Sequence, residues 1–217
     1  MHLHGMSCAA AIFLAAPALG GITRVDDARQ LLASANAIGG GGMDSDADGP
    51  LSPAPFADWD ASASALASVP QAGGSASAVQ LSHLRSDLIL AQGGASASAS
   101  ALGGTSASES LNIFDMTFRL TETSDILLIA STSSVRNGQI TLELTSSTGS
   151  VLFSGSGIFD TTLAAGRYRL FARAHANASA PDGQGGSAGY ALQFITVPGA
   201  STAGLLTAAL LCTRRRR

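Results

Sequence analysis

The chain has 217 residues, of which 46% are hydrophobic and 12% are charged, and its formal net charge is −3 at pH 7. All twelve basic residues are arginine, and four of them form the terminal cluster 214–217. Residues 21–197 therefore carry eight arginines against 15 acidic residues, and this net negative charge disfavours nucleic acid and anionic membrane surfaces as partners. The two cysteines, Cys8 and Cys212, lie in the terminal segments. Residues 21–197 contain no cysteine, which excludes disulfides and thiolate chemistry within that part of the chain.

The N-terminal segment is apolar. Residues 8–19 (CAAAIFLAAPAL) form an apolar run, and Ala18 and Gly20 are small residues of the kind found at cleavage sites. A run of this length that ends in small residues is typical of a secretory signal peptide. We therefore predict that residues 1–20 are a signal peptide, removed by signal peptidase, and that the protein is exported. The alternative interpretation is a buried N-terminal helix.

Residues 21–55 are predicted to form an N-terminal segment with a short helix and an acidic loop. Asp26 and Asp27 suit the first turn of a helix over residues 26–37, because carboxylates favour the positive end of the helix dipole. The glycines at positions 39–42 end this helix.

The acidic loop contains a candidate calcium site. Asp44, Asp46 and Asp48 precede Gly49 in a D-x-D-x-D-G pattern, which opens calcium-binding loops of the EF-hand type. Three carboxylates at alternate positions can converge on a hard cation, so calcium is the candidate cofactor. Pro55 stands where such a loop needs its last carboxylate, and a solvated acidic turn is therefore the competing interpretation.

From residue 56 onward the hydrophobic period changes to two, which is the period of β-strands. Small apolar and hydroxyl residues alternate in three segments, 60–69, 75–81 and 95–101. We predict strands for the first two segments, because they include valine and leucine. The third segment fits a strand and a flexible linker equally well.

The second half of the chain predicts further strands, with a continuous apolar run at 126–130 that indicates full burial. Glycine, asparagine and serine turns separate these strands. The strands are expected over residues 112–121, 126–130, 140–145, 151–154, 158–163, 167–175 and 190–197. This pattern predicts an all-β, antiparallel β-sandwich over residues 56–197.

The sandwich segment resembles a known group of folds. Phe118-Arg-Leu120, Leu142-Glu-Leu144 and the segment 163–170 (LAAGRYRL) are similar to the jelly-roll-like sandwich domains of secreted bacterial proteins. The last segment, a leucine and a glycine turn followed by a tyrosine, is predicted to form a hairpin. Domains of this kind include lectins, carbohydrate-binding modules and structural modules, so the resemblance implies a fold and no activity.

Trp59, the only tryptophan, stands between Asp58 and Asp60. An aromatic plane flanked by two hydrogen-bond acceptors can stack on a sugar ring, so these three residues are a candidate polysaccharide-binding site. The competing interpretation is that Trp59 plugs one end of the sandwich. The sequence has no G-x-S-x-G, H-E-x-x-H or CxxC motif. We therefore predict a non-catalytic protein.

The last twenty residues have the clearest functional pattern. The motif residues are Val197, Pro198, Gly199 and Ala200, and after the apolar segment 202–213 the arginines are Arg214, Arg215, Arg216 and Arg217. A helix of about 14 residues spans roughly 21 Å, which is less than the ~30 Å hydrocarbon core of a bilayer. Arginines resist translocation and act as a stop on the cytoplasmic side. We therefore predict a C-terminal sorting helix over 198–217 that associates with the membrane transiently and awaits cleavage.

This tail resembles the PEP-CTERM class of sorting signals, which occur on exported bacterial proteins processed by exosortase-type membrane enzymes. The segment Pro198–Ala200 here stands where the usual core is Pro-Glu-Pro. The resemblance implies an exosortase-like processing enzyme as a partner and a location in the cell envelope, at the cell surface or outside the cell. Our hypothesis is a structural or adhesive β-sandwich of the surface or extracellular matrix. The alternative is a carbohydrate-binding module that contacts extracellular polysaccharide.

Overall fold

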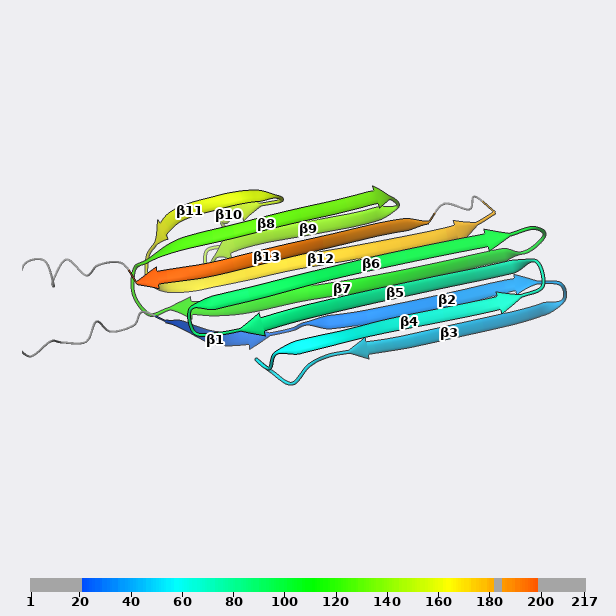
Figure 1. Cartoon of the computed structure of the whole chain (residues 1–217), viewed down its shortest axis with the longest axis horizontal. Helices are drawn as coiled ribbons and strands as arrows, with labels where there is room; N and C mark the ends of the chain where they lie inside the picture. Colours follow the sequence, from blue (N-terminus) through cyan, green and yellow to red (C-terminus); the bar gives the residue numbers. More distant parts are fainter. Residues whose placement is uncertain (1–20, 182–184, 199–217) are drawn as a thin grey trace, which may run out of the picture.

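Small apolar and polar side chains alternate along nearly the whole body of the chain, and this pattern forms strands because every second side chain then reaches the same face. The computed structural model describes residues 21–181 and 185–198, which form two antiparallel sheets packed face to face (Figure 1). The strands are β1 (Ile22–Asp27), β2 (Gln30–Gly39), β3 (Gly42–Leu51), β4 (Trp59–Val69), β5 (Ala72–Leu84), β6 (Leu88–Ala101), β7 (Thr105–Leu120), β8 (Ser124–Arg136), β9 (Gly138–Ser146), β10 (Val151–Ser154), β11 (Gly157–Leu163), β12 (Gly166–Ala180) and β13 (Gly186–Pro198). The prediction of an all-β antiparallel sandwich is confirmed for these residues.

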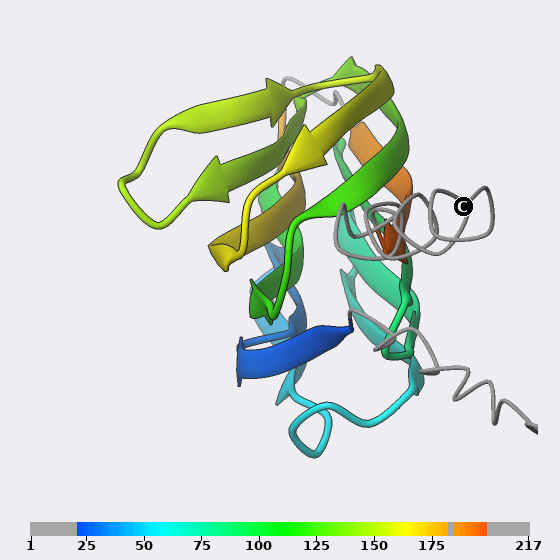
Figure 2. The same ribbon diagram turned by 90° about the vertical axis from the view of Figure 1, so that its left-hand side faces the viewer.

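Each sheet takes strands from both halves of the sequence. Sheet A has the order β10-β9-β12-β7-β2-β3, with β1 paired to β7 as well, and sheet B has the order β11-β8-β13-β6-β5-β4. The view along the strands in Figure 2 shows the two layers separately. Strands β7 and β12 pair over their full common length at the centre of sheet A, and β13 lies between β8 and β6 in sheet B.

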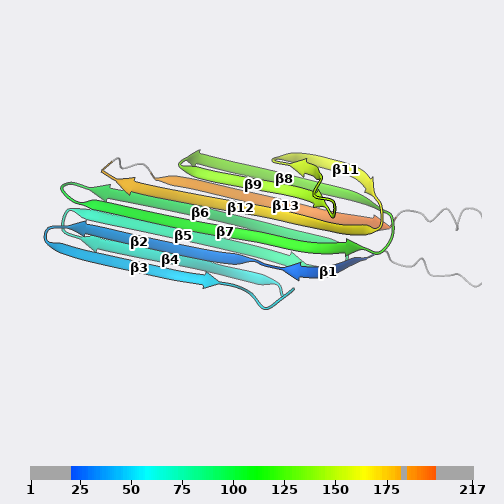
Figure 3. The same ribbon diagram turned by 180° about the vertical axis from the view of Figure 1, so that it is seen from behind.

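The start of β1 and the end of β13 lie at the same end of the body. Ile22 pairs with Leu120 and Pro198 pairs with Ser124, and only a short turn joins these two partners. Figures 1 and 3 show this arrangement from opposite sides. We call this the terminal end of the sandwich and the opposite one the far end.

The helix predicted over residues 26–37 is not formed, and that prediction was wrong. These residues belong to β1 and β2, and the acidic loop predicted after them is strand β3. In β2 the alternate residues Leu31, Ala33, Ala35 and Ala37 are all buried, and this period of two outweighs the helix-start signal of Asp26 and Asp27. The sandwich therefore begins near residue 22 and not at residue 56.

The predicted hairpin over residues 163–170 was also wrong. Strand β11 pairs with β8 in sheet B, whereas β12 pairs with β7 and β9 in sheet A, so the glycine turn carries the chain from one sheet to the other. The Tyr168 hydroxyl donates a hydrogen bond of 2.9 Å to the Ala164 carbonyl and fixes this crossing. The segment 95–101, for which a linker was the alternative, lies in β6.

The core of the terminal half consists of large side chains. Phe118 is fully buried there, with its ring 4.9 Å from that of Phe194 in an edge-to-face contact and 5.9 Å from that of Tyr168. Met116, Leu120 and Leu170 complete the same cluster. Such rings fill the space between two sheets at an ordinary separation.

The core of the far half consists almost only of alanine and serine. The buried alanines that face one another across the two sheets include Ala33, Ala35, Ala37, Ala63, Ala65, Ala67, Ala76 and Ala78. A Cβ atom added at Gly74 of sheet B would lie 3.2 Å from the Ala107 carbonyl oxygen of sheet A. The backbones of the two sheets therefore approach each other closely in this half.

Serine hydroxyls on β7 bond directly to the backbone of the opposite sheet. The Ser106, Ser108 and Ser110 hydroxyls donate to the carbonyl oxygens of Ser100, Ser98 and Ser96 at 3.0, 2.7 and 2.9 Å. All three serines are buried, and each hydroxyl therefore has the partner that burial requires. These bonds hold the far half together where alanine offers little apolar area.

Candidate functional site

A polar groove crosses the outer face of sheet A in the far half. Its volume is about 660 Å³, and it extends over four neighbouring strands, β12, β7, β2 and β3. Two adjacent rows of side chains form it, because the register places Asn177, Glu109 and Ser34 side by side in one row and Ser179, Ala107 and Asn36 in the next. Ala107 is the smallest of these residues and leaves the groove hollow at its centre.

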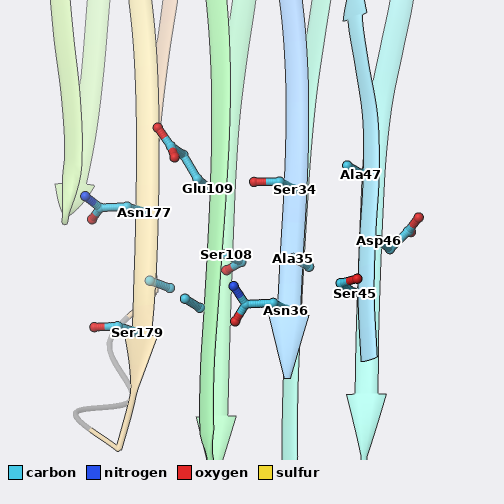
Figure 4. Close-up of a pocket in the computed structure, with 12 residues that line it drawn as sticks. Ser34, Ala35, Asn36, Ser45, Asp46, Ala47, Ser108, Glu109, Asn177 and Ser179 are labelled. Atoms are coloured by element: carbon cyan, nitrogen blue, oxygen red, sulfur yellow. The ribbon is translucent and has the colours of Figure 1, made fainter. Parts of the chain in front are cut away.

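The groove presents hydroxyl and amide groups with the carboxylate of Glu109, and Asp46, whose carboxylate bonds to β4, lines its edge. Figure 4 shows Asn177 and Glu109 on one side and Ser34, Asn36 and Ser45 toward β3. The His175 Nε2 atom lies 2.9 Å from a carboxylate oxygen of Glu109 and holds this acceptor at the edge of the groove. Side chains that both donate and accept hydrogen bonds, on an open surface, match a ligand rich in hydroxyl groups.

The three aspartates of the candidate calcium site lie along one edge strand. The carboxylates of Asp44, Asp46 and Asp48 on β3 accept hydrogen bonds from backbone N–H groups of β4. The donors are Ser68 at 2.8 Å, Leu66 at 2.9 Å and Ser64 at 3.0 Å. Since β3 and β4 are the edge strands of sheets A and B, this row joins the two sheets on one side.

A strand does not bring alternate carboxylates to one point, because residues i and i+2 lie about 6.6 Å apart. Within residues 21–181 and 185–198, no group of three or more histidine, cysteine, aspartate or glutamate side chains is placed to hold a metal ion. Calcium binding by Asp44, Asp46 and Asp48 stays a prediction, and it would require these carboxylates to leave their partners on β4.

Trp59, Asp58 and Asp60 do not share one surface. Trp59 is half-buried and packs against the alanine core, with the Arg29 guanidinium 5.9 Å from its ring centroid, whereas Asp60 is exposed on the outer face. Asp58 precedes the strand and accepts a hydrogen bond of 2.9 Å from the Leu84 amide. This arrangement favours the interpretation of Trp59 as a plug.

Ionisation of Asp58 is favoured by its surroundings. The pKa of its carboxyl lies below the usual value, first because of the Leu84 amide bond and second because of the hydrogen bond with His83. The Arg85 guanidinium lies 3.1 Å from the same carboxylate and acts in the same direction. These contacts tie the loop before β4 to the turn between β5 and β6.

A buried ion pair between the sheets was missed by the sequence reasoning. The Arg29 guanidinium donates to both carboxylate oxygens of Asp27 at 2.7 and 2.6 Å, and both side chains are almost completely buried. Arg29 also donates to the Ser82 hydroxyl and the Ala57 carbonyl, both at 2.7 Å. The sequence contained one signal for this burial. Arg29 stands two residues before Leu31 and four before Ala33, so in a strand it shares their buried face.

A second buried polar contact lies at the same boundary between the two halves. The Tyr190 hydroxyl donates a hydrogen bond of 2.7 Å to the Asn112 side-chain oxygen, and the Asn112 amide donates to the Val79 carbonyl of sheet B. Burial raises the pKa of the Tyr190 phenol. An added Cβ at Gly93 would lie 2.5 Å from both side chains, so glycine is required there. We call these residues, with Asp27, Arg29 and Ser82, the polar belt.

The predicted sorting motif begins inside the last strand. Val197 is exposed and Pro198 is the final residue of β13. Gly199, Ala200 and Arg214–Arg217 lie outside the described residues, as does the predicted signal peptide. In the part of the chain that the structure describes, no helix has the length and hydropathy needed to span a bilayer.

Comparison of the chain with protein-family models, with curated proteins and with solved structures gave no match.

Proposed function

We propose that this is an exported protein whose non-catalytic sandwich acts as a structural or adhesive element at the cell surface or in the extracellular matrix. Residues 1–20 would direct export, and the segment Val197–Arg217 would hold the protein at the membrane until an exosortase-like enzyme cuts it. The jelly-roll-like resemblance of residues 114–195 agrees with a role in which the fold itself presents surfaces.

The observation that supports this proposal most directly is the position of the last strand. Strand β13 pairs with β8 along its length and ends at Pro198, so all the described strands lie before Gly199. Cleavage after this point would remove no strand of the described sandwich. Because β1 starts at the same terminal end, the far half and the groove would point away from a membrane that holds either terminal segment.

The test is the intact mass of the protein from its native cells, separated into medium, surface and membrane fractions. We expect a mass that lacks residues 1 to about 20 and the residues after about 198, in the surface or medium fraction. A full-length C-terminus at Arg217 in the membrane fraction would contradict processing and make the tail a simple anchor.

The polar groove favours a second candidate function, the binding of extracellular polysaccharide. Hydroxyl, amide and carboxylate groups alternate over its two rows, and its open ends along the sheet would let a polymer extend beyond it. Trp59, the predicted platform, faces the core, so sugar stacking on its ring would need the loop before β4 to open.

Affinity electrophoresis in gels that contain matrix polysaccharide from the native cells tests this function. The variant Asn36→Ala with Asn177→Ala removes two exposed amides of the groove, and we expect about tenfold weaker retention from two lost neutral hydrogen bonds. Gln139→Ala is the control, since it removes an exposed amide of the same sheet outside the groove. Trp59→Ala separates the two candidate sites: loss of retention with an unchanged fold would move the site from the groove to Trp59.

A further inference from the structure

The outer face of sheet B carries a cluster of aliphatic side chains in the terminal half. The register places them in adjacent rows, with Ile195 between Leu88 and Leu127 and with Gln193 between Leu90 and Ile129. Ile129 is 40% exposed, and Ile158 beside it is 70% exposed. We call Leu81, Leu88, Leu90, Leu127, Ile129 and Ile195 the aliphatic face. A groove of about 330 Å³ lies within it, lined by Leu81, Leu90 and Ile129.

The same sheet has a different outer surface in its far half. There the Ser75 and Ser98 hydroxyls lie 2.7 Å apart and the Ser77 and Ser96 hydroxyls 2.8 Å apart, so serine pairs replace the aliphatic residues. The far half also exposes Leu66, Val79 and Val135, but these are interspersed with serines. A contiguous aliphatic patch such as that of the terminal half marks a packing site.

The charges around the aliphatic face restrict what can cover it. His83 and Arg85 lie at this face too, but both are paired with Asp58. Asp60 pairs with Leu81, Asp160 with Leu127 and Asp125 with Val197, and all three aspartates are exposed. Asp125 accepts a hydrogen bond of 2.6 Å from Thr162 at this rim. Two copies of the face would bring like charges together, and an anionic bilayer would be repelled. An apolar segment with positive charge at its end is complementary to this surface.

The residues that follow Pro198 have this composition and start at this face. Segment 202–213 is uncharged and contains Leu205, Leu206, Leu210 and Leu211, and four arginines follow it. As a helix, its twelve residues span about 18 Å. The aliphatic face extends from Val197 back to Ala191, six residues of strand or about 20 Å. A reversal at residues 199–201 would lay the segment along the face.

We propose that, in the unprocessed chain in solution, residues 202–213 pack on the aliphatic face and shield it. The arginines would then lie at the level of Ala191, in the row that contains Gln92, Leu81 and Asp60. Cleavage near Pro198 exposes the face. This docking is a role of the tail separate from sorting. It requires that the tail is still present, and it does not depend on how the protein is exported.

The native Cys212 provides the test. The full-length chain carries Cys8→Ser, so that Cys212 is its single native thiol. In the docked helix Cys212 lies about 15 Å from residue 202, at a level between Gln193 and Ala191 on the face. Gln92→Cys puts a thiol in the row of Ala191, and Ser131→Cys is a second variant in that row. Ser98→Cys is the matched control, because it is exposed on the same strand and face but lies about 20 Å farther on.

We expect an intramolecular disulfide to form at positions 92 and 131 and only slowly at position 98, which lies about 43 Å from Pro198 along the sheet. Leu206→Asp with Leu210→Asp should lower the rate at position 92 about tenfold, because the tail then loses its apolar contacts with the face. Equal rates at position 92 with and without these two substitutions would overturn docking, since a free tail of 14 residues has an r.m.s. span of about 21 Å and reaches position 92 unaided. If the disulfides form mainly between two chains, at a rate that rises with protein concentration, the result overturns docking of the tail and indicates that a second copy of the chain covers the face. Neither result changes the mass of the native protein, so the sorting proposal is tested separately.

Discussion

The two halves of the sandwich are held together in different ways. In the terminal half, Phe118, Phe194 and their neighbours fill the space between the sheets, and the stabilisation comes from apolar area. In the far half, alanine brings the sheets closer, and hydroxyls such as that of Ser108 bond to the opposite backbone. Low-complexity Ala/Ser sequence can therefore build a defined core when small size itself permits close backbone approach.

Removal of a ring from the terminal half should have the largest effect. Phe118→Ala leaves a cavity between two other aromatic rings, and we expect a loss of about 3–5 kcal/mol in the free energy of unfolding. Urea denaturation of the full chain measures this value. A loss below about 1 kcal/mol would mean that the sheets close over the gap and that the two halves do not differ in this respect.

The polar belt should be nearly as sensitive. Asp27→Asn leaves the buried Arg29 guanidinium without its anion, and we expect a loss of about 3–5 kcal/mol by urea denaturation. The double variant Asp27→Asn with Arg29→Met removes the unpaired charge and should recover part of this loss. If the double variant is less stable than Asp27→Asn alone, the pair is not the source of the effect.

Enlargement of a side chain tests the far half. Ala65→Leu forces a larger group between closely spaced sheets, so a loss of about 1–3 kcal/mol is expected in thermal or urea unfolding. Ser64→Leu on the same strand points outward and should be close to neutral, as the native Leu66, 68% exposed, already shows for that face. Equal losses for the two variants would contradict close packing of the far half.

The smallest expected effect concerns a single cross-sheet hydrogen bond. Ser108→Ala removes the donor to the Ser98 carbonyl, and we expect a loss of about 1 kcal/mol. Ser77→Ala, which removes an exposed bond on the outer face of sheet B, is the comparison and should cost less. Hydrogen exchange of the β6 amides should rise with Ser108→Ala alone if the bond fastens the two sheets.

The sequence predicted the sandwich because a period of two recurs along the chain, and in segments 60–69 and 75–81 valine and leucine strengthen it. The segment 95–101, with only alanine and serine, fitted a strand and a linker equally well and lies in β6. The prediction failed over residues 26–37, where Asp26 and Asp27 suggest a helix start and the glycines at 39–42 a helix end. The buried parity of Arg29, Leu31 and Ala33 was the stronger signal there, because a strand buries every second residue.

The candidate site was less predictable. The polar groove combines β2, β3, β7 and β12, which are distant in sequence, and its rows depend on strand register. The D-x-D-x-D-G pattern suits a calcium loop and equally suits one side of a strand, since both need acids at alternate positions. Only the pairing of β3 as an edge strand distinguishes them.

The row formed by Asp44, Asp46 and Asp48 also affects solubility. An unpaired strand edge is the usual template on which another molecule adds a strand and aggregation begins. Here three backbone donors of β4 are already occupied by carboxylates of β3. An incoming strand would have to displace these acceptors and approach three negative charges. This side of the molecule therefore resists edge-to-edge polymerisation even at high protein concentration.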